Sequence, residues 1–177
     1  MPDVYVAAGS NVEPEENLAR ALDELEQAFG ALAISPAYRN RAVGFEGPDF
    51  INLVVGFRTV DAPAQVKQAL ERIEALCGRP PKSAKWAPRS MDLDMLLYGD
   101  LVHDEPGLHL PRPDLLKRPF MLGPLADLVP DLRHPTANAT IGELWQRFDR
   151  AAHPMTRVEP SFTSPRSGRR PPRESGR

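Results

Sequence analysis

Two helix-like stretches alternate with four strand-like stretches along this chain, and their order restricts the fold more than any other feature. The strand-like stretches are short runs rich in apolar, β-branched or aromatic residues: 4–8, 31–39, 50–60 and 90–98. The helix-like stretches carry apolar side chains at helical spacing and end near a glycine: 14–29 and 62–76. This order predicts an α+β fold, a ferredoxin-like βαββαβ sandwich.

C-terminal additions and a tail follow this core. Residues 101–110 are typical of a hairpin, and residues 120–128 and 141–148 of short helices. From residue 154 onward the chain is rich in Pro, Ser, Gly and Arg and nearly lacks apolar side chains. With 177 residues in all, we predict one domain over residues 1–153 and a disordered tail over residues 154–177.

The composition is that of a soluble globular protein, with 41% hydrophobic and 26% charged residues. The formal net charge is −2, so the overall charge does not call for nucleic acid or an anionic membrane as a partner. No apolar stretch approaches the roughly 20 residues that span a bilayer. The start of the chain lacks the features of a signal peptide, and the single Cys77 fits a reducing compartment. We therefore expect a cytoplasmic protein.

Two common kinds of site are not indicated. Neither G-x-x-x-x-G-K-S/T nor G-x-G-x-x-G occurs, so a nucleotide site would not be of the P-loop or Rossmann type. A zinc site is not expected either, because no ligand spacing relates the four histidines: His103, His109, His134 and His153.

An acidic pair lies in the last strand-like stretch. Residues i and i+2 of a strand point to one face, so Asp92 and Asp94 stand side by side. Two adjacent carboxylates repel each other unless a cation lies between them. A pair of carboxylates is a typical ligand set for Mg²⁺, which fills its other positions with phosphate oxygens and waters. Surface strands also carry alternating acids, so the pair by itself leaves a solvated strand face as an alternative.

A basic loop precedes this strand. Its prolines preclude long regular structure, and its cations are Arg79, Lys82, Lys85 and Arg89. Cations beside a metal-binding acidic pair can clamp phosphate oxygens during phosphoryl transfer. Trp86 offers a flat face for a base or ring. The alternative is a solvated loop whose tryptophan packs on the core; the neighbouring acids favour the phosphate interpretation.

Asn52 interrupts the apolar run at residues 50–55. A buried amide needs hydrogen-bond partners, and it pairs well with the donors and acceptors of a heterocycle. By alternation Phe50 shares its face. A structural asparagine that bonds a neighbouring loop is equally compatible with this residue alone.

The motifs occur in a distinctive order. They are Ala8-Gly9-Ser10-Asn11, Tyr38-Arg39, Pro48-Asp49-Phe50-Ile51-Asn52, Arg72-Ile73-Glu74, Gly78-Arg79, Lys85-Trp86-Ala87-Pro88-Arg89-Ser90-Met91-Asp92-Leu93-Asp94, Arg118-Pro119-Phe120-Met121-Leu122 and Pro124-Leu125. In this set and order the chain resembles the 6-hydroxymethyl-7,8-dihydropterin pyrophosphokinase family, over roughly residues 4–150.

The resemblance implies an ATP-dependent enzyme of folate biosynthesis. It would transfer the diphosphate of ATP to the hydroxymethyl group of 6-hydroxymethyl-7,8-dihydropterin and release AMP. These two substrates would be its partners, and we expect a monomer or a weak dimer. Two Mg²⁺ ions are implied at Asp92 and Asp94, and catalytic roles at Arg79 and Arg89. The implied ATP contacts are Glu74, Lys82, Trp86, Arg89, Arg112 and Arg118. The implied pterin contacts are Asn40, Ala42, Val43, Phe50, Asn52 and Phe120.

Four positions depart from the usual pattern of the family. Pro81 stands where a basic residue is common, Arg112 replaces a histidine on the nucleotide side, Phe50 replaces a tyrosine and Ala87 a glycine. Because both aspartates and the arginines are present, we expect these changes to tune ATP affinity.

Two other functions fit the same topology. A nucleotidyl-transfer palm uses strand carboxylates, but residues 50–57 supply none on a neighbouring strand. A ferredoxin-like RNA-binding module needs exposed aromatic residues on central strands with basic surroundings, for which Phe50 alone is thin support.

Overall fold

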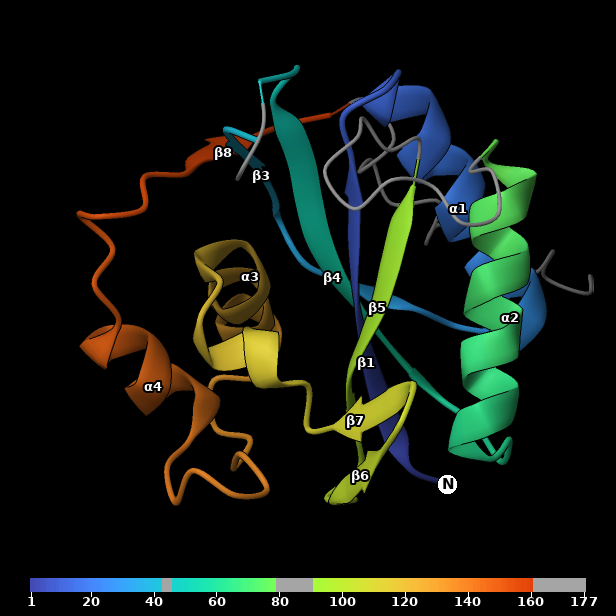
Figure 1. Cartoon of the computed structure of the whole chain (residues 1–177), viewed down its shortest axis with the longest axis vertical. Helices are drawn as coiled ribbons and strands as arrows, with labels where there is room; N and C mark the ends of the chain where they lie inside the picture. Colours follow the sequence, from blue (N-terminus) through green and yellow to red (C-terminus); the bar gives the residue numbers. More distant parts are fainter. Residues whose placement is uncertain (43–45, 79–90, 161–177) are drawn as a thin grey trace, which may run out of the picture.

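One antiparallel sheet organises the computed structural model, which describes residues 1–42, 46–78 and 91–160. Within these residues the sheet has six strands in the order β5-β1-β4-β3-β8, and β2 also pairs with β4 (Figure 1). The strand bounds are β1 Asp3–Ser10, β2 Ala33–Ile34, β3 Ala37–Asn40, β4 Phe50–Arg58, β5 Asp92–Tyr98 and β8 Thr156–Val158.

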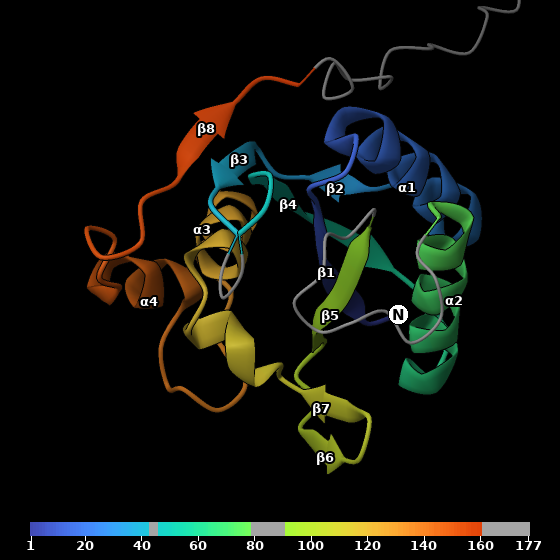
Figure 2. The same ribbon diagram turned by 45° about the horizontal axis from the view of Figure 1, so that its top comes forward.

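Helices cover both faces of the sheet. Those on one face are α1 (Pro14–Phe29) and α2 (Pro63–Leu76), while α3 (Pro119–Leu128) lies on the other face with α4 (Ile141–Arg147) outside it (Figures 1 and 2). With β1, β3, β4 and β5, the first two helices complete the predicted ferredoxin-like βαββαβ sandwich. The predicted strands and helices all form, with ends shifted by a few residues.

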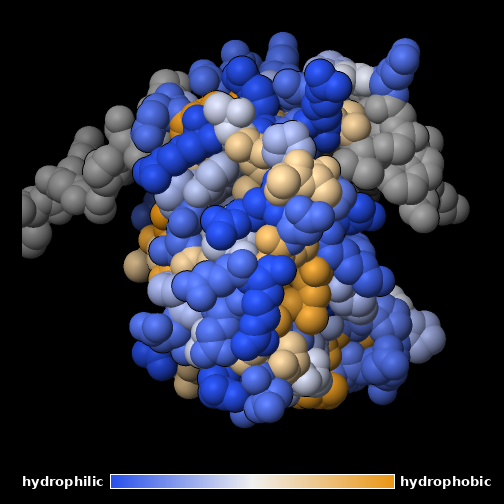
Figure 3. Space-filling view, turned by 90° about the vertical axis from the view of Figure 1, so that its left-hand side faces the viewer, coloured by the Kyte–Doolittle hydropathy of each residue, from blue (hydrophilic) through white to orange (hydrophobic). Residues whose placement is uncertain are grey.

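Side chains of β1 divide between two hydrophobic cores. Val4, Val6 and Ala8 pack under α1 and α2, whereas Ala7 belongs to the core under α3. Central strands buried on both faces are apolar at nearly every position, which explains why residues 50–57 show no clean alternation. The surface of the molecule over α3, α4 and β8 is mostly hydrophilic, with a narrow strip of apolar side chains (Figure 3).

The predicted C-terminal additions, a hairpin and two short helices, are all present. The hairpin consists of β6 (His103–Glu105) and β7 (Leu108–Leu110), and a 3₁₀ turn, η1 (Pro113–Leu116), leads into α3. A register shift in the β1–β5 ladder places both Leu96 and Leu97 in the core under α3. No helix of the described ranges is long and apolar enough to cross a bilayer.

Strand β8 differs from the sequence expectation, which placed residues 154–160 in a disordered tail. It pairs antiparallel with β3, and Val158 packs against the core under α1 and α2. A three-residue edge strand is held by main-chain hydrogen bonds and one apolar side chain, so it leaves almost no periodic signal. The ordered chain therefore extends to residue 160; residues 161–177 lie outside the described residues, and their disorder stays a prediction.

Two truncations test this boundary. Removing residues 161–177 should leave the melting temperature unchanged, because that segment offers little apolar surface to bury. Removing residues 155–177 also deletes β8, and we expect a melting temperature a few degrees lower, at about 2–4 °C per kcal/mol for a domain of this size. Calorimetry on both variants measures the difference; equal melting temperatures would show that β8 contributes no stability.

His134 is a buried polar group near α4. Its Nδ1 accepts hydrogen bonds from the N–H groups of Thr136 and Ala137, at 3.1 and 3.0 Å, while Nε2 is buried without a partner among the described residues. Burial lowers the pKa of this imidazole below its usual 6.5. The folded protein therefore resists protonation of His134, whereas the unfolded chain takes up the proton near pH 6.5.

This difference predicts that the free energy of unfolding decreases as pH falls below 6.5, by at most about 1.4 kcal/mol per pH unit for one proton. His134→Asn keeps an acceptor near the position of Nδ1 and removes the titration. Denaturant unfolding of both proteins between neutral pH and about pH 5 should show a shallower pH dependence for the variant. Identical pH profiles would contradict the assignment.

Candidate active site

A cavity of about 770 Å³ lies over the face of the sheet that α3 covers, bounded by α2 and the β6–β7 hairpin. It brings together nearly all the sequence-predicted site residues that the structure describes: Asn40, Phe50, Asn52, Glu74, Asp92, Asp94, Arg112, Arg118 and Phe120. Ala42 is the exception and lines a neighbouring cavity of about 380 Å³, which shares Asn40, Arg118 and Phe120 with the first. Five predicted residues lie outside the described residues: Val43, Arg79, Lys82, Trp86 and Arg89.

The acidic pair forms one wall of the cavity. Asp92 and Asp94 point toward it because Leu93 and Met95, which alternate with them, pack in the core under α1 and α2. In the β1–β5 ladder Asp92 lies opposite Gly9 and Asp94 opposite Ala7. Because these partners are small, they leave open space beside the carboxylates, which are only partly exposed.

Arg112 forms an ion pair with one member of this acidic pair, Asp94. Its Nη2 lies 3.3 Å from Oδ1 of Asp94, and its Nε lies 3.9 Å from Oδ2 of Asp114. The backbone is held at the same place, since the N–H of Arg112 donates to the carbonyl of Leu96 at 2.9 Å. The sequence predicted Arg112 as a nucleotide contact, and the structure places it directly beside a predicted metal ligand.

Glu74 has a structural role that the sequence did not reveal. Its Oε2 accepts a hydrogen bond from the N–H of Leu93 at 3.1 Å. Among the described strands β5 is the edge of the sheet, so this outward N–H does not pair with another of them. Helix α2 thereby fixes the backbone between the two aspartates.

The opposite wall of the cavity carries an amide and two aromatic rings. Asn52 is 7% exposed, and its Nδ2 donates to Oδ1 of Asn40 on the adjacent strand β3. Phe50 and Phe120 line the same cavity from β4 and α3. The wall thus offers hydrogen-bonding groups beside flat apolar faces, which suits a planar heterocycle.

Gly9 makes room for Asn52. The two residues are paired in the β1–β4 ladder, and a Cβ on Gly9 would overlap Oδ1 of Asn52 and lie 3.8 Å from Cδ1 of Phe50. Gly9 does not have a positive φ, so close approach rather than backbone freedom requires glycine here. This gives a physical reason for a motif residue to which the sequence assigned no role.

Other polar residues of the cavity were not predicted. On α2, Lys67 lies two turns and Glu71 one turn before Glu74, and this helical spacing is the signal that could have found them. His109 and Asp114 border the cavity from β7 and η1.

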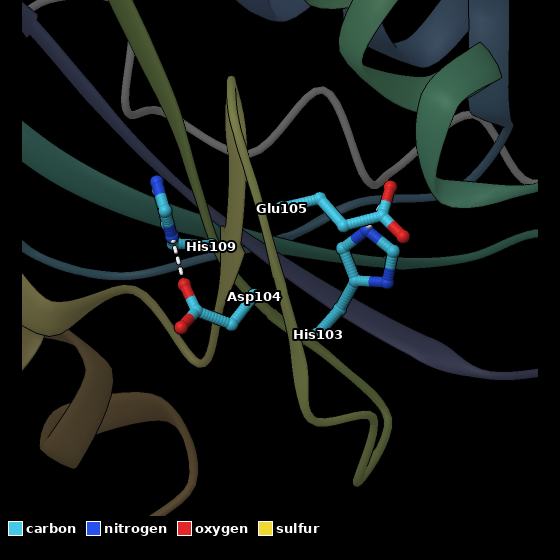
Figure 4. A network of polar contacts seen from close by, with 4 residues as sticks. All are labelled: His103, Asp104, Glu105 and His109. Carbon is cyan, nitrogen blue, oxygen red and sulfur yellow. Dashed lines mark hydrogen bonds and ion pairs between the residues drawn. The ribbon is translucent and has the colours of Figure 1, made fainter.

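The hairpin holds two separate histidine–carboxylate contacts rather than one cluster. His109 pairs across the strands with Asp104, while His103 pairs with Glu105 at 3.5 Å on the other side of the hairpin (Figure 4). In the described part of the chain no three His, Cys, Asp or Glu side chains gather so as to hold a metal ion. A metal at Asp92 and Asp94 would thus draw its other ligands from elsewhere.

Comparisons with known proteins agree on one family. The family model described as 7,8-dihydro-6-hydroxymethylpterin-pyrophosphokinase (HPPK) matches residues 5–130. A 2-amino-4-hydroxy-6-hydroxymethyldihydropteridine pyrophosphokinase from Pseudomonas aeruginosa is 43% identical over 136 residues, covering 75% of this chain and 83% of the relative. The protein of the same name from Synechocystis is 38% identical over 147 residues, covering 81% and 75%.

Solved structures share the fold. The crystal structure of wild-type Plasmodium falciparum HPPK-DHPS with pteroate superposes with a TM-score of 0.66 at 16% identity. The match covers 82% of this chain and 42% of that longer one. At this identity the likeness concerns the fold alone.

Proposed function

The chain belongs to the 7,8-dihydro-6-hydroxymethylpterin-pyrophosphokinase family, whose members are enzymes of folate biosynthesis, and we propose that its 770 Å³ cavity is the active site. There the diphosphate of ATP is transferred to the hydroxymethyl group of 6-hydroxymethyl-7,8-dihydropterin, and AMP is released. The observation that carries this proposal is the meeting of an acidic pair and an amide-and-aromatic wall in one cavity. Family membership sets aside the palm and RNA-binding alternatives.

Magnesium fits the donors of the acidic wall. Asp92 and Asp94 offer hard carboxylate oxygens on one face of β5, and water and phosphate oxygens would complete the octahedral shell that Mg²⁺ prefers. We propose two such ions, held by these two residues. Bound there, Mg²⁺ would neutralise the charge of the transferring diphosphate.

The pterin is assigned to the opposite wall. Phe50 and Phe120 would stack on its ring, and Asn52 would bond its polar edge while Asn40 fixes the amide. Ala42 and Val43 would complete this end of the site, Ala42 from the neighbouring cavity that shares Asn40 and Phe120.

ATP is assigned to the side of the cavity that Arg112 and Arg118 line. Their guanidinium groups would hold phosphate oxygens, together with Lys82, while Glu74 and Trp86 contact the nucleotide. Arg79 and Arg89 would stabilise the charge that develops during transfer.

The reaction then follows from positioning. The hydroxymethyl oxygen attacks the β-phosphorus in line; its bond to phosphorus forms as the bond from that phosphorus to the α-phosphate oxygen breaks. AMP leaves with that oxygen, and the hydroxyl proton is released. The walls of the cavity would hold the two substrates close to each other for this attack.

The partners proposed are these two substrates. We further propose that the protein is cytoplasmic and is a monomer or weak dimer. We propose no nucleic-acid or membrane partner.

Product analysis tests the function. The protein should form AMP from ATP and Mg²⁺ only when the reduced hydroxymethyl-pterin is present. AMP formed at the same rate without pterin, or no turnover with both substrates, would overturn the proposal.

Gly9→Ala tests the pterin wall. The new methyl group should displace the Asn52 side chain and weaken pterin binding by about tenfold, with ATP affinity nearly unchanged. Calorimetric titration with each ligand measures both effects. Gly47→Ala, in the exposed loop before β4, is the matched control. Unaltered pterin affinity in Gly9→Ala would contradict the assigned position of Asn52.

A further inference from the structure

Arg112 occupies a place where it interacts with the acidic pair before any substrate is bound. Its guanidinium lies between Asp94 and Asp114, at 3.3 and 3.9 Å. The side chains of Arg112 and Asp94 are 35% and 25% exposed, so solvent screens their attraction only in part. The hydrogen bond from the Arg112 N–H to Leu96 anchors the residue to β5, two positions along from Asp94.

One N–H donor of the Arg112 guanidinium is not satisfied by this arrangement. Nε of Arg112 is buried and makes no hydrogen bond in the described part of the chain. A buried donor without an acceptor costs free energy. A phosphate oxygen that reaches this donor would supply a hydrogen bond that the contacts with Asp94 and Asp114 do not provide.

We propose that Arg112 is an internal counter-cation of the acidic pair, which holds Asp94 in the free enzyme and turns to the phosphates when ATP binds. This inference rests on the metal role proposed above for Asp92 and Asp94. Its consequence is that the free enzyme binds a divalent cation weakly, and that nucleotide and metal bind cooperatively.

Charge and geometry supply the mechanism. A guanidinium at 3.3 Å from Oδ1 of Asp94 neutralises part of the carboxylate and repels a second cation at the same oxygen. The guanidinium of arginine is a planar fork of N–H donors that pairs with two oxygens of one phosphate group, so a bound triphosphate draws Arg112 away. Asp94 then no longer shares its charge with Arg112 as the cation arrives with the nucleotide.

Direct binding of Mn²⁺, measured by electron paramagnetic resonance, tests this inference without relying on turnover. The proteins compared are wild type, Arg112→Gln and Arg112→Lys, each with and without a non-hydrolysable ATP analogue. Lys67→Gln is the matched control, because it removes a cation from the same cavity that pairs with Glu71 rather than Asp94.

Without nucleotide, Arg112→Gln should bind Mn²⁺ about tenfold more tightly than wild type, because a charge beside the site is gone. Arg112→Lys keeps the charge, so its Mn²⁺ affinity should stay within about twofold of wild type. The same holds for Lys67→Gln, because the ammonium group that it removes is farther from Asp94 than Arg112 is. With the analogue, the advantage of Arg112→Gln should disappear, and its affinity for the analogue should be lower than that of wild type. Equal Mn²⁺ affinity in wild type and Arg112→Gln, or an equal gain in Lys67→Gln, would overturn the inference.

Asp94→Asn distinguishes failure of the inference about Arg112 from failure of the metal assignment. Loss of Mn²⁺ binding in the presence of the analogue supports the assignment on which the inference depends. If Asp94→Asn binds Mn²⁺ as wild type does, both the metal role of Asp94 and the inference about Arg112 are wrong.

Discussion

Asp92→Asn and Asp94→Asn should each leave a folded protein whose turnover is lower by on the order of a thousandfold. Asparagine keeps the volume of the side chain and removes the negative charge that a Mg²⁺ ligand needs. The same change relieves repulsion between neighbouring carboxylates on one face of β5. For Asp92→Asn we therefore expect a melting temperature equal to or above that of wild type. Asp94→Asn also removes the ion pair with Arg112, so its melting temperature should not exceed that of wild type. Both variants should lose activity.

Initial rates at saturating ATP and pterin, with calorimetric melting curves, measure both quantities. Asp131→Asn, an exposed aspartate that lines neither cavity, is the control for removing one charge. If either cavity variant keeps near-wild-type turnover at ordinary Mg²⁺ concentrations, the metal assignment is wrong.

Asn52→Ala should weaken pterin binding by about 1–3 kcal/mol, which is about 5- to 150-fold in Kd. The heterocycle would lose hydrogen-bond partners on its polar edge, and Oδ1 of Asn40 would lose the donor that Asn52 provides. ATP binds on the other side of the cavity in our assignment, so its affinity should barely change. Titrations with pterin alone and with an ATP analogue alone measure the two affinities separately.

Asn17→Ala provides the comparison for Asn52→Ala. Asn17 is an amide of α1 that bonds the carbonyl of Val12 and lines neither cavity. Its removal should leave both affinities unchanged. If Asn52→Ala weakens both ligands to the same extent, Asn52 supports the structure rather than the pterin.

The sequence predicted the core of the fold because its signals are local. Helical spacing in α1 and α2, and short apolar runs for the strands, each reflect burial within a single element. Strand β8 gave no such signal, since the pairing of Val158 with Ala37 depends on a contact far along the chain. The register shift beside Tyr5 likewise follows from pairing between strands.

Part of the site was predicted in the same way. Alternation along β5 placed Asp92 and Asp94 on one face, and the resemblance supplied roles for residues on β3, β4, α2 and α3 and in the connections between elements. Two relations between residues were missed: the hydrogen bond from Leu93 to Glu74, and the room that Gly9 leaves for Asn52. Both join segments distant in sequence, and only the packed structure brings them together.

The fate of each phosphate of ATP tests the central claim most directly. ATP labelled at the γ-phosphorus, and in a parallel reaction at the α-phosphorus, is incubated with the protein, Mg²⁺ and reduced hydroxymethyl-pterin, and the products are separated. We expect the γ label in the pterin product and the α label only in AMP, with the two products in equal amounts. Release of ADP, or γ label in free phosphate with the pterin unmodified, would contradict transfer of a diphosphate to this substrate.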